Sequence, residues 1–235
     1  MKLIIQVPCK NEEKTLPVTL ADLPREVPGF EAVELLVIDD GSTDRTVEVA
    51  REHQVDHIVR LTNNKGLASA FQAGLDAALK LGADVIVNTD ADNQYHGPDV
   101  VRLVQPILAG DADMVVGSKA MKGASDQRPL VRRAATRVIN GMLRIALYFR
   151  GTDTHGLKAF DRRALLPVVE ACVIDRDLFA SELVIRAGRA TLRVIEIPIR
   201  LHEKRPPAIN LVRRVPHVLR GMAKLTYVIR FGGRP

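Results

Sequence analysis

The sequence of 235 residues contains no tryptophan and only two cysteines. Cys9 and Cys172 are too few for a disulfide framework, and their spacing is not that of metal ligands. The apolar run at residues 3–7 is shorter than the core of a signal peptide, and no stretch approaches the roughly eighteen apolar residues of a membrane-spanning helix. We therefore expect a protein of the reducing cytoplasm that does not span a membrane.

Two common phosphate-binding motifs are also missing. The chain has neither G-x-G-x-x-G nor G-x-x-x-x-G-K-S/T, which argues against a Rossmann dinucleotide site and a P-loop. The formal net charge is +6, and it is unevenly distributed. Acidic residues crowd the first half, whereas lysine and arginine dominate from Lys119 onward. The second half therefore favours an anionic partner such as phosphate, nucleic acid or a lipid surface.

Apolar runs and helical patterns alternate along the first half of the chain. Strands are predicted at residues 3–7, 34–38, 57–61, 85–87 and 113–117, and helices at 43–53, 67–79 and 98–108. Ser42 is the expected N-cap of the first of these helices. Repetition of strand, helix and strand requires right-handed crossovers. The pattern predicts an α/β fold with a doubly wound, mainly parallel sheet flanked by helices.

The pattern changes after Lys119. A basic helix is predicted at residues 128–149, a short strand at 157–160, a helix at 178–187 and a strand at 192–199. Residues 209–231 read as an amphipathic helix with apolar and basic residues on opposite sides. That helix either packs on its own domain or lies on an anionic membrane surface, and the sequence leaves both open. We expect one domain at residues 1–205 and a C-terminal helical unit at 206–235.

A pair of carboxylates follows the predicted strand at residues 85–87. Asp90 and Asp92 are separated by one alanine, and residues two apart in an extended backbone point the same way. Like charges held this close repel unless a cation lies between them. Mg²⁺ or Mn²⁺ binds such carboxylates while keeping positions for water or phosphate oxygens, and Gln94 can add a carbonyl oxygen. The plainer interpretation is a solvated acidic turn before the helix near Pro98.

Every predicted strand of the first half ends in a polar cluster. The clusters are residues 8–12, 39–42, 63–66, 90–94 and 117–119. Turn chemistry explains any single one of them. Ligands of doubly wound sheets bind at the carboxyl ends of the strands, so the coincidence of all these clusters at one edge predicts a binding site there.

These residues together resemble the nucleotide-sugar-dependent glycosyltransferases of family 2, fold type A. The motifs that carry the resemblance stand in family order: V-P-C-K-N-E-E, V-I-D-D-G-S-T-D, N-N-K-G-L-A-S-A, T-D-A-D-N-Q-Y, V-V-G-S-K and D-T-H-G-L-K-A-F. They are most similar to those of dolichyl- and polyprenyl-phosphate mannosyl- and glucosyltransferases. The resemblance implies an inverting hexosyltransferase with GDP-mannose or UDP-glucose as donor, a polyprenyl phosphate as acceptor and Mg²⁺ or Mn²⁺ as cofactor.

The resemblance also implies roles for single residues. The nucleotide would contact the first three clusters, with Asp40 near the base, through Pro8, Asn11, Glu12, Asp40, Ser42, Lys65 and Gly66. Asp90, Asp92 and Gln94 would hold the metal ion that assists loss of the nucleotide. Lys119 and Arg205 are the candidate contacts to the acceptor or its phosphate. Residues 1–119 are then the nucleotide-sugar half of a catalytic domain, and residues 120–205 are its acceptor half.

The acceptor decides whether the reaction needs a base. A lipid phosphate arrives ionised, whereas a hydroxyl acceptor must lose a proton to a carboxylate, for which Glu182 and Asp153 are the candidates. His155 is interpreted as structural. The segment from residue 202 reads H-E-K-R-P-P-A-I-N where lipid-phosphate mannosyltransferases commonly show R-x-x-G-x-S-K, so the acceptor stays open. A polyprenyl acceptor would place the protein peripherally at the inner face of the membrane.

Two rival interpretations use the same residues. A non-catalytic protein that binds polyanions would explain the basic second half, but it leaves the carboxylate clusters without a purpose. A sugar nucleotidyltransferase would be expected to carry a glycine-rich basic loop after the first strand, and P-C-K-N-E-E is not such a loop. We therefore expect a transferase whose partners do not include nucleic acid.

Overall fold

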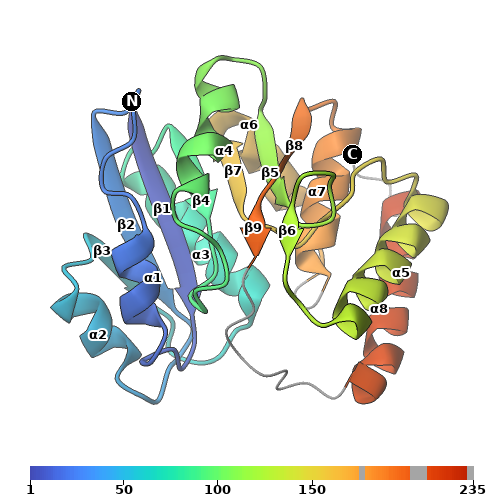
Figure 1. Ribbon diagram of the computed structural model, residues 1–235, viewed down its shortest axis with the longest axis horizontal. Coiled ribbons are helices and arrows are strands. Elements are labelled where there is room, and N and C mark those ends of the chain that lie inside the picture. The colour runs from blue at the N-terminus through green and yellow to red at the C-terminus, as the bar shows by residue number, and fades with distance from the viewer. Residues whose placement is uncertain (175–177, 202–210, 232–235) are drawn as a thin grey trace.

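Seven strands form one sheet in the computed structural model, which describes residues 1–174, 178–201 and 211–231 (Figure 1). Their order across the sheet is β3-β2-β1-β4-β7-β5-β8. All neighbours pair in parallel except β7, which is antiparallel to both β4 and β5. The predicted mainly parallel sheet is thereby confirmed. The strands are β1 (Lys2–Cys9), β2 (Ala32–Asp39), β3 (His57–Arg60), β4 (Val85–Asn88), β5 (Met114–Ser118), β7 (Lys158–Asp161) and β8 (Val194–Pro198).

Helices cover both faces of this sheet (Figure 1). Ile4 of β1 faces the core beneath α3, α6 and α7, whereas its neighbours Leu3 and Ile5 face the core beneath α1, α2 and α4. Because both faces are covered, the strands appear in the sequence as unbroken apolar runs. The helices are α1 (Leu16–Asp22), α2 (Thr46–Glu52), α3 (Leu67–Lys80), α4 (Asp99–Leu108), α6 (Arg162–Ala171) and α7 (Phe179–Arg189).

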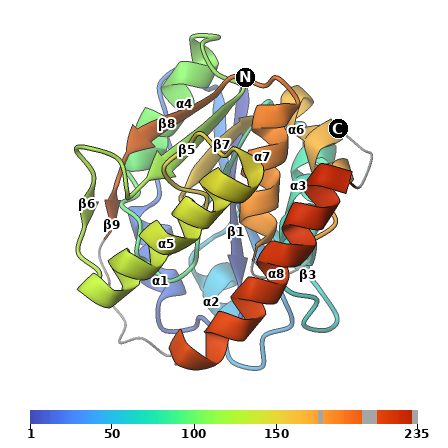
Figure 2. The ribbon, with the colours of Figure 1, turned by 90° about the vertical axis from the view of Figure 1, so that its right-hand side faces the viewer.

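Two further helices lie side by side on the flank of the domain, as Figure 2 shows for α5 (Leu130–Leu147) and α8 (Leu211–Phe231). Nε of Arg230 in α8 donates to the carbonyl of Ala146 at 2.8 Å, and Arg189 of α7 donates to the carbonyl of Ile229 at 2.8 Å. Leu225 is fully buried. The C-terminal helix therefore packs on its own domain. No helix of the described ranges is long and apolar enough to cross a bilayer.

A small second sheet lies next to the carboxyl edge of the large one. It pairs β6 (Ser125–Asp126) with β9 (Arg200–Leu201) in parallel, and Tyr95 forms a bridge to Leu201. The segments that follow β5 and β8 are thus brought beside the segment that follows β4. Neither short strand was expected from the sequence.

The start and the N-cap predicted for one helix are wrong, and another helix was missed. The helix expected at residues 43–53 begins only at Thr46, because the Asp44 carboxylate accepts from the backbone N–H of Thr46 at 3.0 Å and keeps the preceding residues in a turn. Ser42 is therefore not an N-cap. Helix α6 was not predicted, although Asp161 caps it by accepting from the backbone N–H groups of Arg163 and Ala164.

Candidate active site

The loops after β1 and β2 are tied to each other. The backbone N–H of Asn11 donates to Oγ of Ser42 at 2.9 Å, and Oδ1 of Asn11 accepts from the backbone N–H of Thr43 at 2.8 Å. Asn11 has a φ of 55°, a left-handed conformation that asparagine adopts more readily than most residues. Asn11 and Ser42, both expected to contact a nucleotide, thus also hold these loops together.

Asp40 anchors the loop that enters α3. Its carboxylate accepts from the backbone N–H of Lys65 at 2.7 Å and from that of Gly66 at 2.9 Å. Gly66 has a φ of 91°, where any other residue would be strained. The side chain of Lys65 is exposed. The structure brings these three residues together, and their contact with a nucleotide stays a prediction.

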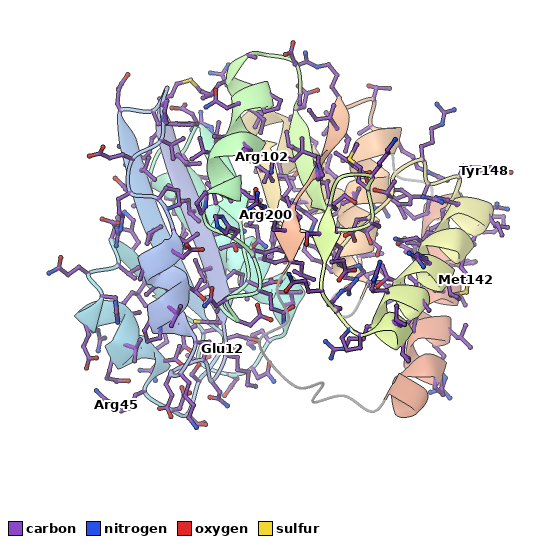
Figure 3. All side chains as sticks on the ribbon, viewed as in Figure 1. Glu12, Arg45, Arg102, Met142, Tyr148 and Arg200 are labelled. Carbon is purple, nitrogen blue, oxygen red and sulfur yellow. The ribbon has the colours of Figure 1, made fainter. Side chains whose placement is uncertain are left out.

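A cleft opens at the carboxyl edge of β1, β2 and β4, which is the lower edge of the sheet in Figure 3, where Glu12 is labelled. The backbone N–H of Glu12 donates to Oγ1 of Thr46 at 2.8 Å, which fixes this part of the loop. Many of the residues singled out from the sequence line this cleft, namely Pro8, Glu12, Asp40, Asp90 and Asp92.

Asp90 lies at the bottom of the cleft among many protein atoms, yet its carboxylate is open to solvent. Desolvation by these atoms raises its pKa, and the nearby ammonium groups of Lys158 and Lys119 offset only part of the rise. The protein therefore compensates the charge of Asp90 incompletely. A bound cation would lower this pKa and favour the ionised carboxylate.

The carboxylates Asp90 and Asp92 suit a hard divalent ion. No group of three or more Asp, Glu, His or Cys side chains placed for a metal occurs in residues 1–174, 178–201 and 211–231. Mg²⁺ in phosphate-handling sites is commonly held by one or two carboxylates, with phosphate and water oxygens completing its coordination. The two carboxylates after β4 fit that description.

Gln94 contacts Asp92 directly. Nε2 of Gln94 donates to Oδ2 of Asp92 at 2.7 Å, and its backbone N–H donates to Oδ1 at 3.3 Å. A partner of this kind orients a metal ligand and is placed outside the ligands themselves. Gln94 thus contacts Asp92, and its direct contact with a metal ion stays a prediction.

Lys119 and Asp153 form a buried ion pair with 2.7 Å between Nζ and Oδ2. Asp153 also accepts from the backbone N–H of Lys119 at 3.2 Å and from that of His155 at 3.0 Å. Burial raises the pKa of Asp153, but Lys119 and these hydrogen bonds outweigh it and hold the pKa below its usual value. A carboxylate in this state is a poor proton acceptor, which weighs against Asp153 as a base.

Glu182 is completely buried in α7. Its carboxylate accepts from Nε of Arg186 at 2.8 Å and from the backbone N–H groups of Val173 and Ile174 at 3.0 and 2.6 Å. These contacts tie the end of α6 to α7. They are the contacts of a structural carboxylate, and Glu182 lines neither the cleft nor the pocket that contains Lys119.

A basic pocket lies beyond Asp92, against the inner face of α5. Its lining includes Lys119, Arg128, Asn140 and His155, and we call it the basic pocket. Arg128 was not among the residues predicted for the site, because it was assigned to the start of the basic helix at residues 128–149. It precedes α5, and its guanidinium pairs with both oxygens of Asp126 at 2.9 and 2.8 Å. Arg205, the other predicted acceptor contact, lies outside the described residues.

Lys158 is a second residue that was missed. It opens β7 with an exposure of 5%, and its ammonium donates to the carbonyl of Gly156 at 2.7 Å. Burial lowers its pKa to about 8, although Asp90 and Asp153 oppose the shift. A lysine inside the apolar run L-K-A-F was the only indication that the sequence offered.

Comparisons with known proteins agree with this arrangement. The family model described as "Glycosyl transferase family 2" matches residues 4–166. Polyprenol monophosphomannose synthase of Mycolicibacterium smegmatis is 30% identical over 212 residues, covering 86% of this chain and 78% of that protein. Undecaprenyl-phosphate mannosyltransferase of Micrococcus luteus is 29% identical over 211 residues, covering 87% of this chain and 85% of that protein.

A solved structure shows the same architecture. Glucosyl-3-phosphoglycerate synthase from Mycobacterium tuberculosis, in complex with Mg²⁺ and uridine diphosphate, matches with a TM-score of 0.69. The match covers 100% of this chain and 80% of that one at 19% sequence identity. At this identity the likeness shows the fold alone, and it confirms the fold type expected from the sequence.

Proposed function

The chain belongs to glycosyltransferase family 2 and is a nucleotide-sugar-dependent transferase, and we propose that it transfers a hexose to a polyprenyl phosphate. The donor would be GDP-mannose or UDP-glucose. The observation that carries the proposal is that the cleft lined by Asp90 and Asp92 and the basic pocket lined by Lys119 and Arg128 both lie beside the segment that follows β4. Two of the relatives are named for transfer to polyprenol or undecaprenyl phosphate.

On the donor side, the cleft would hold the nucleotide. Asp40 keeps the loop before α3 in place, and Pro8 and Glu12 at the end of β1 line the same cleft. Asp90 and Asp92 would hold Mg²⁺ or Mn²⁺, which supplies positive charge to the departing nucleoside diphosphate. Gln94 orients Asp92 for that contact.

On the acceptor side, the basic pocket suits a phosphate group. Lys119 and Arg128 present cationic donors, and charge-assisted hydrogen bonds to phosphate are among the strongest available to a protein. A phosphate nucleophile is already ionised and needs no base. The alternative acceptor, a hydroxyl, needs one, and both candidates, Asp153 and Glu182, are engaged in buried contacts. The lack of a carboxylate that is available as a base among these two candidates therefore supports a phosphate, and not a hydroxyl, as the acceptor.

The outer faces of α5 and α8 suit an anionic membrane surface. Val131, Val138 and Ile145 recur every two turns of α5 and are 66%, 62% and 82% exposed, so one side of this helix is apolar toward solvent. Tyr227 and Phe231 are 67% and 72% exposed on α8. Large apolar side chains on two adjacent helices form the kind of surface that binds a partner or a bilayer.

Basic side chains accompany these apolar ones. Arg220 and Lys224 are exposed on α8, and Arg137 and Arg144 are exposed on α5. The inner face of α5 lines the basic pocket, so a lipid at its outer face would lie across this helix from the proposed phosphate site. We therefore propose residues 206–235 as a unit that attaches the catalytic domain, residues 1–205, to the membrane surface.

A transfer assay tests this function. Purified protein is incubated with radiolabelled GDP-mannose or UDP-glucose, with Mn²⁺, Mg²⁺ or a chelator, and with either undecaprenyl phosphate or undecaprenol. We expect label to reach the lipid from one donor, only with undecaprenyl phosphate, and only with metal. Faster transfer to undecaprenol or to 3-phosphoglycerate would contradict the proposed acceptor.

A further inference from the structure

The loop that enters β7 lies against the basic pocket and carries the partner of Lys119. It spans residues 151–157 and contains neither a helix nor a strand, and we call it the β7 loop. Asp153 of this loop binds the Lys119 ammonium, and the carbonyl of His155 accepts from the same ammonium at 3.2 Å. A loop without regular structure depends on other elements to bind its backbone groups. The position of Lys119 therefore depends on what holds the β7 loop.

Glu196, in the outermost strand β8, binds the first half of the β7 loop. Its Oε1 accepts from the backbone N–H of Thr152 at 2.7 Å and from that of Asp153 at 3.2 Å. Its Oε2 accepts from the same N–H of Thr152 at 2.9 Å and from the Thr152 hydroxyl at 2.5 Å. A Cβ at Gly151 would lie 2.5 Å from Oε1, so only glycine lets the loop come this close to the carboxylate. One side chain thus fixes the backbone on both sides of the Thr152–Asp153 peptide bond.

The charge of Glu196 is used by the loop and not by a cation. In the described part of the chain, no salt bridge involves this carboxylate. Hydrogen bonds to an ionised acceptor are roughly twice as strong as those between neutral groups. Glu196 therefore holds Thr152 and Asp153 more firmly than a neutral side chain could.

Resting on the proposed function, we propose that Glu196 is a positioning residue for the acceptor phosphate. It holds Asp153 in place, and through Asp153 it holds the Lys119 ammonium at the basic pocket. Glu196 itself lines neither the cleft nor the basic pocket, so it must act through the β7 loop. Among the described residues that line the cleft, none belongs to this loop. Acceptor binding should therefore depend on Glu196, and binding of the nucleotide should not.

The far side of the β7 loop has its own supports. The hydroxyl of Tyr95 donates to the carbonyl of His155 at 2.8 Å, and Tyr95 itself is bridged to Leu201 of β9. Nδ2 of Asn140 in α5 donates to the carbonyl of Thr152 at 2.6 Å. Because these contacts do not involve Glu196, its replacement should shift the segment with Asp153 without unfolding the loop.

Glu196→Gln tests the inference. It keeps the shape of the side chain but replaces one acceptor oxygen by an NH₂ group that faces the donors of Thr152. The matched control is Glu34→Gln in β2, since Glu34 is a carboxylate of the same sheet that pairs with Lys2 and His57. For each variant we measure Tm, the KM for undecaprenyl phosphate with saturating donor, and the Kd of GDP or UDP with Mn²⁺ by titration calorimetry.

The two variants should differ in the acceptor KM. For Glu196→Gln we expect this KM to rise about tenfold, kcat to fall by less, and the Kd of the nucleotide to stay within about twofold. Glu34→Gln should lower Tm and leave both binding constants unchanged. Thr152→Val removes only the hydroxyl that donates to Glu196, so it should raise the acceptor KM by a smaller factor.

A double variant tests the route through Lys119. Groups that act in one network are not additive, so Glu196→Gln should change the acceptor KM little in a Lys119→Met background. Additive effects would overturn this route. A wild-type acceptor KM in Glu196→Gln, or a nucleotide Kd that rises as much as the acceptor KM, would overturn the positioning role while the proposed function stands. A wild-type protein that transfers nothing to undecaprenyl phosphate would overturn both.

Discussion

Replacing Asp153 by alanine distinguishes a structural carboxylate from a catalytic one. The change leaves the Lys119 ammonium, 2.7 Å from Asp153 in the native protein, as a buried cation without its partner. Removing one partner of a buried ion pair costs about 3–5 kcal/mol. In a chain of this length each kcal/mol lowers Tm by about 2–4 °C, so we expect a fall of about 6–20 °C. Scanning calorimetry measures it.

The matched control removes both charges. The double variant Asp153→Ala, Lys119→Met has no unpaired cation, so it should recover part of the loss seen in the single variant. Transfer assays are run below the lowered Tm. A variant Asp153→Ala with the wild-type Tm but without turnover would refute the structural reading and restore Asp153 as a base.

Acid should remove the same stabilisation. Burial raises the pKa of Asp153, but Lys119 and the hydrogen bonds outweigh it, so the pKa in the folded protein is below the ordinary value. A carboxyl of this kind stabilises the fold above its unfolded pKa of about 4 and loses that contribution as the pH falls through the folded value. Below about pH 4 the Tm of the wild type should therefore fall more steeply than that of the double variant.

Three further changes probe the proposed donor site and the proposed membrane surface. Asp92→Asn should reduce transfer by more than about a hundredfold with an unchanged Tm. The reason is that even residues that only hydrogen-bond to metal ligands contribute about 10–100-fold to activity. Wild-type turnover would contradict the metal assignment. Asp40→Ala leaves the backbone N–H groups of Lys65 and Gly66 without their acceptor and should weaken nucleotide binding about tenfold, with or without metal. An effect confined to the nucleotide sugar, and absent with the free nucleotide, would show that the nucleotide base lies elsewhere. Replacing Arg220 and Lys224 together by glutamine should weaken sedimentation with anionic vesicles at low salt by about thirtyfold, because each lost positive charge removes roughly 1 kcal/mol. Undiminished binding would contradict the proposal that α8 lies on the membrane surface.

The sheet and its acidic edge could be predicted because their signals are local. β1, β2 and β4 are buried on both faces and appear as apolar runs, and Asp90 and Asp92 directly follow one of them. In a parallel sheet the ends of such strands meet at one edge whatever the details of packing. The same reasoning predicted the position of Asp40.

The basic side of the site depends on contacts between distant residues. Lys119 and Asp153 are 34 positions apart, and nothing in either motif indicates that each is the partner of the other. Glu182 was predicted as a candidate base because a sequence does not show backbone contacts. In the structure its carboxylate accepts from the backbone N–H groups of Val173 and Ile174. Residues 202–210 lie outside the described ranges, so Arg205 remains a prediction.

The direction of β7 explains how Lys158 and the loop with Asp153 reach the same sheet edge as Asp90. A parallel strand between β4 and β5 would bring its last residues to the carboxyl edge. β7 is antiparallel, so it brings its first residue, Lys158, and the preceding loop with Asp153 and His155. β7 also lies between β4 and β5, at the usual strand spacing of about 4.8 Å from each of them. The added width falls between the acidic end of β4 and Lys119, which follows β5.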